Sequence, residues 1–368
     1  MKRLKRAGVL LLALLMIFSL AGCKKKEEAP KEETKKEKEE PKETEPVEKE
    51  EPAEEAPANQ NLLTGLGDLT DGAIGKRPVA VMINNVQDAL PQYGIGKADI
   101  IYEIPVEGDV TRLMAVYGDY TTVPKICAVR SCRYYFPAFS ETYDAFYVNW
   151  GIDDSIADYL EALNLDQYDG INNAGGLFGR DQERLDKGYS LEHTGYFDGT
   201  RFAEVVQSEG RRTDLADDMK RTAFHFNGLN EQVKPEGSDC KTASIDFGGA
   251  SAVLTYDEAS KTYLKQINGT PQMDDSTQTQ LAFTNVFILE TDISVRDDVG
   301  HKQLNWNGGT DYTGYYVSNG AVQKIHWYKD ANNERSKLHL VDMNGNEIKV
   351  NRGKSYIAVN YPGQSQFQ

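Results

Sequence analysis

Histidine and cysteine are scarce in this sequence, with five and four residues among 368. Up to about residue 230 the histidines are His193 and His225, and the acids near them form no spacing of two histidines with a carboxylate. Transition-metal sites in proteins are usually built from such sets. The sequence therefore argues against a metal site, and no metal and no other cofactor is predicted.

The cysteines cannot form a fully paired disulfide framework. Cys23 follows the apolar N-terminal run and belongs to a lipidation motif described below, so it is not available for a disulfide. This leaves Cys127, Cys132 and Cys240, an odd number. At least one thiol must stay unpaired or pair with another molecule. A bridge from Cys127 to Cys132 needs a turn, because an extended run of five residues would separate the α-carbons by about 17 Å. Nothing in the spacing specifies a Cys–His nucleophilic pair, so buried inert thiols are the simpler interpretation.

An excess of positive charge is also missing. The formal net charge is −16, whereas a nucleic-acid-binding surface needs a basic stripe that displaces counterions from phosphates. No nucleic-acid partner is predicted, and anionic wall polymers such as teichoic acids should be repelled at long range. Any site for an anion must therefore be local.

The apolar run at the N-terminus is too short to span a membrane. It covers residues 7–20, about 14 residues, whereas a spanning helix needs roughly 20. Four basic residues precede the run, and Leu20, Ala21, Gly22 and Cys23 follow the lipobox pattern of bacterial lipoproteins. Residues 1–23 are thus predicted to be a lipoprotein signal peptide, with Cys23 as the lipidated residue. Two acyl chains would give stable anchoring at the extracytoplasmic face of the cell membrane.

Residues 24–60 have the composition of a tether. They contain nine lysines and fourteen glutamates, no aromatic residue and one β-branched aliphatic residue, Val47. Such a segment cannot bury enough apolar surface to offset its ordering entropy, so it is predicted to be disordered. Residues 24–26 are three lysines beside the lipid, which either bind anionic headgroups or simply solvate the linker.

The rest of the chain is predicted to form two domains, because about 308 residues exceed a usual single core. Residues 61–230 alternate strand-like runs such as "PVAVMIN" with amphipathic helical patterns at 153–164 and 198–210. This indicates a mixed α/β domain. Residues 231–368 contain short alternating runs with Asn-Gly turns and no sustained helical period, which predicts a mainly antiparallel β domain. The expected fold class is α+β.

Four arginines of the first domain lie in or beside apolar runs: Arg112, Arg130, Arg133 and Arg180. Glu107 precedes this set, and Asp181 and His193 follow it in "GRD" and "EHTGYF". Arginine presents a planar fork that fits carboxylate and phosphate, so several converging arginines would hold an oxyanion in a partly dry cleft. The alternative is a structural salt-bridge network in which Arg130 pairs with Glu107 and Arg180 pairs with neighbours of Asp181.

These segments also carry a resemblance to a known family. "ADIIYEIPVEGDVTRLMAVY", "AVRSCRYYF", "GRD", "EHTGYF" and "NGAVQKIHW" occur in this order, and over about residues 70 to 364 the chain resembles the YerB-like lipoproteins of Gram-positive bacteria. The resemblance implies an N-terminal α/β domain and a C-terminal β domain, but no activity. It implies these motif positions: Glu107, Thr111, Arg112, Arg130, Ser131, Arg133, Arg180, Asp181 and His193. Cys132 and Asn149 depart from the usual alanine and histidine, which argues against a thiol mechanism and against a base at residue 149.

Three functions stay open, and the first is favoured. It is a lipid-anchored envelope protein with an arginine-lined anion-binding cleft, which binds an anionic wall fragment or an envelope protein without turnover. The second is a hydrolase or transferase on peptidoglycan or a phosphorylated wall polymer. Ser131, His193 and Asp181 match a catalytic triad by type, although no Gly-x-Ser-x-Gly surrounds the serine. The third is a protein scaffold that uses an edge strand of the β domain.

Overall fold

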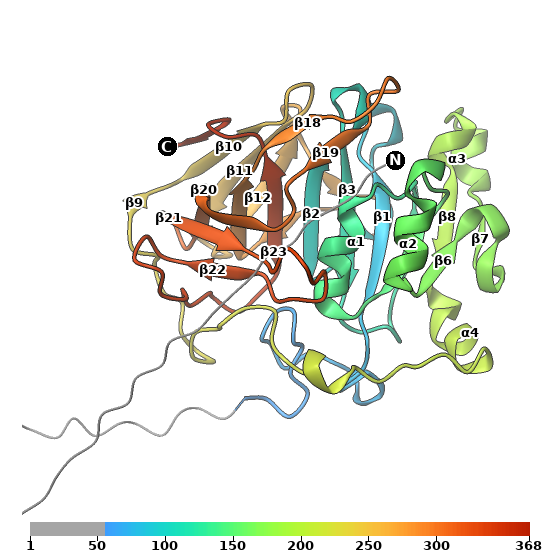
Figure 1. Ribbon diagram of the computed structural model, residues 1–368, viewed down its shortest axis with the longest axis horizontal. Coiled ribbons are helices and arrows are strands. Elements are labelled where there is room, and N and C mark those ends of the chain that lie inside the picture. Colours follow the sequence, from blue (N-terminus) through green and yellow to red (C-terminus); the bar gives the residue numbers. More distant parts are fainter. Residues whose placement is uncertain (1–55) are drawn as a thin grey trace, which may run out of the picture. The chain divides into compact units, whose positions relative to one another are not determined.

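The computed structural model describes residues 56–368 (Figure 1). The predicted signal peptide, the lipidation residue Cys23 and most of the predicted tether lie outside the described residues. Within the described part, no helix is long and apolar enough to cross a membrane.

An eleven-stranded sheet organises the fold, with the order β22-β21-β20-β17-β23-β2-β3-β1-β5-β6 and β9 beside β21. Strands from before residue 230 are β1 (Val79–Asn84), β2 (Ile100–Pro105), β3 (Thr111–Tyr117), β5 (Phe146–Asn149) and β6 (Gln167–Asp169). Later strands are β9 (Ser238–Asp239), β17 (Asn285–Glu290), β20 (Gly308–Ser318), β21 (Ala321–Tyr328), β22 (His339–Val341) and β23 (Ser355–Asn360). The two groups meet where β2 pairs in parallel with β23. Strands near this junction are buried throughout, which explains their nearly continuous apolar sequences.

Smaller sheets complete the strand content. The second sheet contains β10 (Thr242–Asp246), β11 (Ser251–Asp257), β12 (Thr262–Ile267), β13 (Thr270–Pro271), β16 (Ala282–Phe283) and β24 (Ser365–Phe367). Two hairpins pair β14 (Met273–Asp274) with β15 (Thr279–Gln280) and β18 (Ile293–Val295) with β19 (Lys302–Leu304). A three-stranded sheet joins β4 (Lys125–Cys127), β8 (Gly195–Asp198) and β7 (Phe178–Arg180).

The α-helices of the described part are short and all precede residue 230. They are α1 (Tyr135–Ser140), α2 (Ala157–Leu163), α3 (Gln182–Asp186) and α4 (Phe202–Ser208). The predicted helices at 153–164 and 198–210 are present as α2 and α4, each preceded by a 3₁₀ turn. Helices α1 and α3 were not predicted, because each has fewer than two turns and shows no helical period that stands out.

Two apolar clusters cover the two faces of the main sheet. On one face Val81 of β1 belongs to a cluster with Leu254 and Tyr263 of the second sheet. On the other face Tyr102 of β2 packs against Phe139 of α1, with ring centroids 5.0 Å apart. Each fully buried side chain of this kind stabilises the fold by roughly 1.5–3 kcal/mol.

The predicted fold class is confirmed: a mixed α/β part comes first and a mainly antiparallel β part follows. The two-domain division at about residue 230 stays a prediction. Both parts contribute strands to one continuous sheet, so the sheet itself does not stop at that point of the chain.

Candidate functional site

Most of the motif positions gather at one edge of the main sheet. Strands β1, β2, β5 and β6 run in one direction, because β3 is antiparallel to β1 and β2 while β5 and β6 follow β1 in parallel. Their carboxyl ends therefore share an edge, which is where open α/β sheets bind ligands. We call it the carboxyl edge and define it by Asn84, Pro105, Asn149 and Asp169. The arginine segment lies against it, since the Arg130 backbone bonds both Met82 and Trp150 at 3.0 Å.

Glu107 joins two of the predicted arginines. Its Oε1 accepts a hydrogen bond from Nη2 of Arg112 at 2.6 Å, and its Oε2 accepts one from Nε of Arg133 at 2.8 Å. The two arginine side chains are only 6% and 10% exposed. Burial raises the pKa of Glu107, but the Arg133 hydrogen bond and both positive charges outweigh it and lower the pKa to about 2. Burial and the Arg133 charge lower the pKa of Arg112 to about 10. One carboxylate thus serves two guanidinium groups.

Arg130 lies beside this trio and is partly open to solvent. Its Nη1 is 3.0 Å from Oε2 of Glu192, and the two side chains are 26% and 55% exposed. Its Nε is buried and has no hydrogen-bond partner among residues 56–368. The Arg130 charge also lowers the pKa of Arg112. Arg130 therefore keeps donor capacity that the fold does not use.

His193 lies next to Arg130 but is held by the end of β1. Its Nδ1 is 3.0 Å from Nδ2 of Asn84, and its Nε2 is 4.0 Å from Oε1 of Glu192. Burial lowers the pKa of His193, and the Arg130 charge lowers it further. The imidazole is therefore biased towards its neutral form.

Arg180 is exposed and stacks on Trp150. Its Cζ lies 4.2 Å from the indole ring centroid, and its Nη1 donates to the carbonyl of Leu191 at 2.7 Å. It has no carboxylate partner within the described chain. Trp150 packs closely against two glycines: a Cβ added at Gly170 or Gly195 would come within 2.6 or 2.9 Å of the ring. Arg180 and Arg130 contact the adjacent residues Leu191 and Glu192, so both arginines lie beside the same turn.

The residues suggested as a triad are held apart by other partners. Asp181 accepts from the backbone N–H of Arg184 at 2.9 Å as the N-cap of α3, and from Nζ of Lys125 at 2.6 Å. His193 faces Asn84 instead of a carboxylate through Nδ1. Ser131 is half-buried, and its carbonyl accepts from Nη1 of Arg112 at 2.9 Å. The serine, histidine and aspartate therefore lack the hydrogen bonds that a triad needs.

Thr111 belongs to a buried network behind the carboxyl edge. Its hydroxyl donates to Oε1 of Glu103 at 2.8 Å, and Nζ of Lys265 is 2.9 Å from Oε2 of the same carboxylate. The side chains of Glu103 and Lys265 are fully buried, and Tyr356 and Asn85 donate to Glu103 as well. A buried ion pair with this many hydrogen bonds is well satisfied. Thr111 is thus part of the junction between the two sheets and not of an open site.

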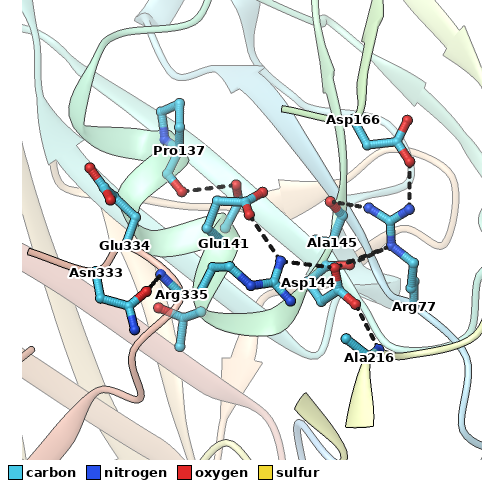
Figure 2. A network of polar contacts seen from close by, with 12 residues as sticks. Arg77, Pro137, Glu141, Asp144, Ala145, Asp166, Ala216, Asn333, Glu334 and Arg335 are labelled. Carbon is cyan, nitrogen blue, oxygen red and sulfur yellow. Dashed lines mark hydrogen bonds and ion pairs between the residues drawn. The ribbon is translucent and has the colours of Figure 1, made fainter. Parts of the chain in front are cut away.

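A second arginine cluster lies at the opposite edge, where β1 and β5 begin (Figure 2). Asp144 accepts two bonds of 2.7 Å from Arg212 and one of 3.2 Å from Arg335. Each arginine of the cluster has an acidic partner, and the carboxylates outnumber the arginines: Arg77, Arg211, Arg212 and Arg335 with Glu141, Asp144, Asp166, Glu209 and Asp218. This cluster is neutralised internally, although it borders a hollow of about 470 Å³.

One grouping of possible metal ligands occurs in the described part, formed by Asp153, Asp297 and His301 with ligand atoms within 4.8 Å of one another. Arg296 contacts Asp153 and also lies 3.2 Å from Oδ2 of Asp297. Since a guanidinium already supplies positive charge to both carboxylates, the grouping is explained as an ion-pair cluster.

Two further features are the three buried thiols of the described part and a surface hollow. Cys127, Cys132 and Cys240 are free and buried, and burial raises the pKa of Cys127 to about 11 and that of Cys132 to about 12. Such thiols are poor nucleophiles. A surface hollow of about 420 Å³ lies beside His193 and is lined by Asp88, Lys187, Gly188, Tyr189, Ser190 and His193.

Sequence reasoning missed Trp150 and Glu192. Trp150 is one of three tryptophans and directly follows a strand-like run, which was a usable signal. Glu192 precedes His193 inside the "EHTGYF" motif, and its pairing with Arg130, 62 positions earlier, depends on the fold. The glycine of the same motif, Gly195, is explained by its contact with Trp150.

Comparisons with known proteins place the chain in a family. Residues 63–212 match the model described as "Protein of unknown function (DUF3048) N-terminal domain", and residues 243–357 match the corresponding C-terminal domain. The chain is 26% identical over 257 residues to "Putative lipoprotein YerB" of Bacillus subtilis (strain 168), which covers 68% of this chain and 73% of that protein. The crystal structure of Bacillus subtilis YerB has the same fold, with a TM-score of 0.69, 23% identity, and coverage of 84% of this chain and 99% of that one. The predicted resemblance is confirmed, and the chain belongs to the DUF3048 family.

Proposed function

We propose that this protein is a lipid-anchored, extracytoplasmic protein of the cell envelope that binds an anionic group at the carboxyl edge. Attachment to the membrane as a lipoprotein is supported by the likeness to the YerB protein of Bacillus subtilis, which is described as a lipoprotein, and by the lipobox at Cys23. The ligands we envisage are wall fragments that carry phosphate or carboxylate groups.

One observation carries the proposal: among residues 56–368, the four predicted arginines have two carboxylates as ion-pair partners. Glu107 pairs with Arg112 and Arg133, and Glu192 pairs with Arg130. In the cluster at the opposite edge, by contrast, every arginine has an acidic partner and the acids outnumber the arginines. In a chain of net charge −16, an accessible arginine without a carboxylate partner would be the preferred local place for an anion.

The arginines would play two roles. Arg130 and Arg180 are accessible, so their guanidinium groups would contact the anion directly. Arg112 and Arg133 are buried and fixed by Glu107, so they would act through charge at longer range. Arginine retains free N–H donors even when it stacks on an aromatic ring, which suits Arg180 on Trp150 for this task.

Binding without turnover is the form that the geometry favours. A general base is normally oriented by a partner such as a carboxylate, whereas Nδ1 of His193 faces the amide of Asn84. The hydroxyl of Ser131 therefore lacks an activating neighbour of the kind that acyl transfer requires.

The proposal is tested by thermal unfolding of the unlipidated chain, with Cys23→Ser, in sulfate or phosphate at constant ionic strength. A bound anion raises the melting temperature as its concentration passes Kd. We expect this rise for the parent chain and for Arg201→Gln, an exposed arginine outside the cluster, and a loss of it for Arg130→Gln with Arg180→Gln. An identical rise in all three chains would contradict the proposal.

A further inference from the structure

One ring nitrogen of His193 has no hydrogen-bond partner. The residue is 7% exposed, and it lines the hollow of about 420 Å³ described above. Its Nδ1 lies 3.0 Å from the side-chain nitrogen of Asn84, whereas its Nε2 makes no hydrogen bond within residues 56–368. Oε1 of Glu192 is 4.0 Å from Nε2, which is too far for a hydrogen bond. Polar groups on nearly buried side chains usually have partners, so a bound molecule could supply one here.

The hydrogen bonds of Asn84 determine which nitrogen of His193 carries the proton. The side-chain oxygen of Asn84 accepts from the backbone N–H of Val86 at 3.2 Å, so the side-chain nitrogen faces His193. Because an amide NH₂ group only donates, Nδ1 of His193 must accept this bond. The neutral imidazole then carries its proton on Nε2. Nε2 is therefore a hydrogen-bond donor without an acceptor in the described chain.

The surroundings of His193 keep its ring neutral. Burial is the main cause of its lowered pKa. The charged groups around the ring oppose one another, with Arg130 and Arg184 lowering the pKa and Glu192 and Asp88 raising it. A second ring proton would have to lie on Nδ1, where it would face the N–H donors of Asn84. The hydrogen bond to Asn84 thus opposes protonation in the same direction as burial.

The Glu192 carboxylate indicates what kind of group Arg130 and His193 can share. Its Oε2 lies 3.0 Å from Nη1 of Arg130, and its Oε1 lies 4.0 Å from Nε2 of His193. The carboxylate is thus between two donors and within hydrogen-bond distance of one of them. Its side chain is 55% exposed, so a ligand anion could take its place at little cost in stability. A phosphate group has enough acceptor oxygens to bond both donors at once.

The hollow beside His193 suits the alcohol part of a phosphate ester. Apart from Gly188, every residue that lines it has a hydrogen-bonding side chain: Asp88, Lys187, Tyr189, Ser190 and His193. A carboxylate such as Asp88 repels a second anion but accepts hydrogen bonds from hydroxyl groups. The volume of about 420 Å³ lies within the ~300–1,000 Å³ of small-molecule sites. These properties fit a group rich in hydroxyls.

We propose that the carboxyl edge binds a sugar phosphate, with the phosphate replacing the Glu192 carboxylate between Arg130 and His193 and the sugar lying in the hollow. This inference rests on the proposed function, because it specifies the anion that is bound there. His193 determines specificity in this arrangement, since its Nε2–H donates to a phosphate oxygen while the ring borders the hollow. The two nearby acids have separate effects: Glu192 competes with the phosphate, and Asp88 accepts hydrogen bonds from the sugar.

The position of the proton is tested by NMR of the Cys23→Ser chain with ¹⁵N-labelled histidine. The signals of His193 are those that disappear in His193→Asn. Without ligand we expect a neutral ring with its proton on Nε2 at about pH 7 and above. A proton on Nδ1, or a charged ring at that pH, would overturn the inference.

The ligand class is tested by calorimetric titration of the same chain with glucose 1-phosphate and with inorganic phosphate at one ionic strength. We expect glucose 1-phosphate to bind at least about tenfold more tightly, because the sugar adds hydrogen bonds in the hollow. Glu192→Gln should tighten the binding of both compounds by up to about fivefold, because it removes the competing carboxylate.

Matched variants separate the two parts of the site. His193→Asn keeps an acceptor for Asn84 but has no donor in place of Nε2, so it should weaken phosphate binding about tenfold. His193→Gln can place an amide donor near the Nε2 position and should retain more of the affinity. Asp88→Ala with Ser190→Ala should reduce the advantage of glucose 1-phosphate over phosphate. Asp311→Ala, at an exposed aspartate of β20, should bind both compounds like the parent.

The outcomes distinguish this inference from the proposed function. Suppose that phosphate binding depends on Arg130 and Arg180, but is unchanged in His193→Asn and no weaker than that of glucose 1-phosphate. This result would overturn the sugar-phosphate inference alone. Binding that does not depend on Arg130 and Arg180 would overturn the proposed function as well. The comparison of the two compounds needs only the parent chain, so it holds even where a variant lowers the melting temperature.

Discussion

Replacing Glu107 with glutamine should destabilise the protein at neutral pH, because this carboxylate holds two buried guanidinium groups together. Its pKa falls from 4.5 to about 2 in the fold. A shift of this size corresponds to about 3 kcal/mol between the two charge states. The side chain is 24% exposed, so solvent screening reduces the expected loss to about 2 kcal/mol.

The sign of the pH dependence follows from the same shift. A depressed carboxylate pKa stabilises the fold above pH 4.5, and this contribution is lost as the pH falls towards 2. Urea unfolding at pH 7 should thus separate Glu107→Gln from the parent, and the difference should shrink as the pH falls.

Glu192→Gln is the matched control, since Glu192 also pairs with a carboxyl-edge arginine but is 55% exposed. Exposed pairs contribute little, so its free energy of unfolding should stay within about 0.5 kcal/mol of the parent. Equal losses for Glu107→Gln and Glu192→Gln, or a pH-independent difference for Glu107→Gln, would refute the assignment of Glu107 as the shared counter-ion.

Three further predictions concern groups other than the carboxyl-edge arginines and their acids. Lys265→Met should cost about 3–5 kcal/mol in urea unfolding because it leaves the fully buried Glu103 without its cation, and adding Glu103→Gln should recover part of the loss. Glu141→Gln should remove a fall in stability that occurs as the pH rises from about 4.5 to 7, since burial raises the pKa of Glu141 to about 7 and only the folded state holds the proton over this range. A thiol-specific reagent at pH 8 should leave Cys127 and Cys132 unmodified until the protein unfolds, because both thiols are buried with raised pKa values.

The strands were predictable because their signal is local. "PVAVMIN" is apolar throughout, and β1 (Val79–Asn84) is buried along its whole length between two layers. The Asn-Gly turn at Asn319 and Gly320 likewise marks the hairpin of β20 and β21. The pairing of β2 with β23, by contrast, joins residues about 255 positions apart and leaves no local signature in either segment.

The grouping of the candidate arginines was predictable, but their pairing was not. Arg112, at the start of β3, and Arg133, which follows β4, meet because Glu107 in the segment before β3 bonds both at the carboxyl edge. Which acid neutralises which arginine depends on approach within about 4 Å, and sequence spacing does not encode that distance. The Glu107–Arg130 pair of the salt-bridge alternative was wrong for this reason: Glu107 pairs with Arg112 and Arg133, and Arg130 pairs with Glu192.

The two arginine clusters show why composition alone does not identify a site. Arg212 and Arg130 are both partly exposed arginines at an edge of the same sheet, at 47% and 26%. Arg212 is matched by a bidentate bond to Asp144, a carboxylate buried beneath it, so an incoming anion would have to displace an internal one. The partner of Arg130 is Glu192, whose side chain is more than half exposed. An anion could replace this carboxylate beside Arg130 at little cost in stability, because exposed ion pairs contribute little. On the proposed function, a binding arginine therefore differs from a structural one in the burial of its counter-ion. At the carboxyl edge that criterion selects Arg130, while Arg180 has no carboxylate partner among residues 56–368 to displace.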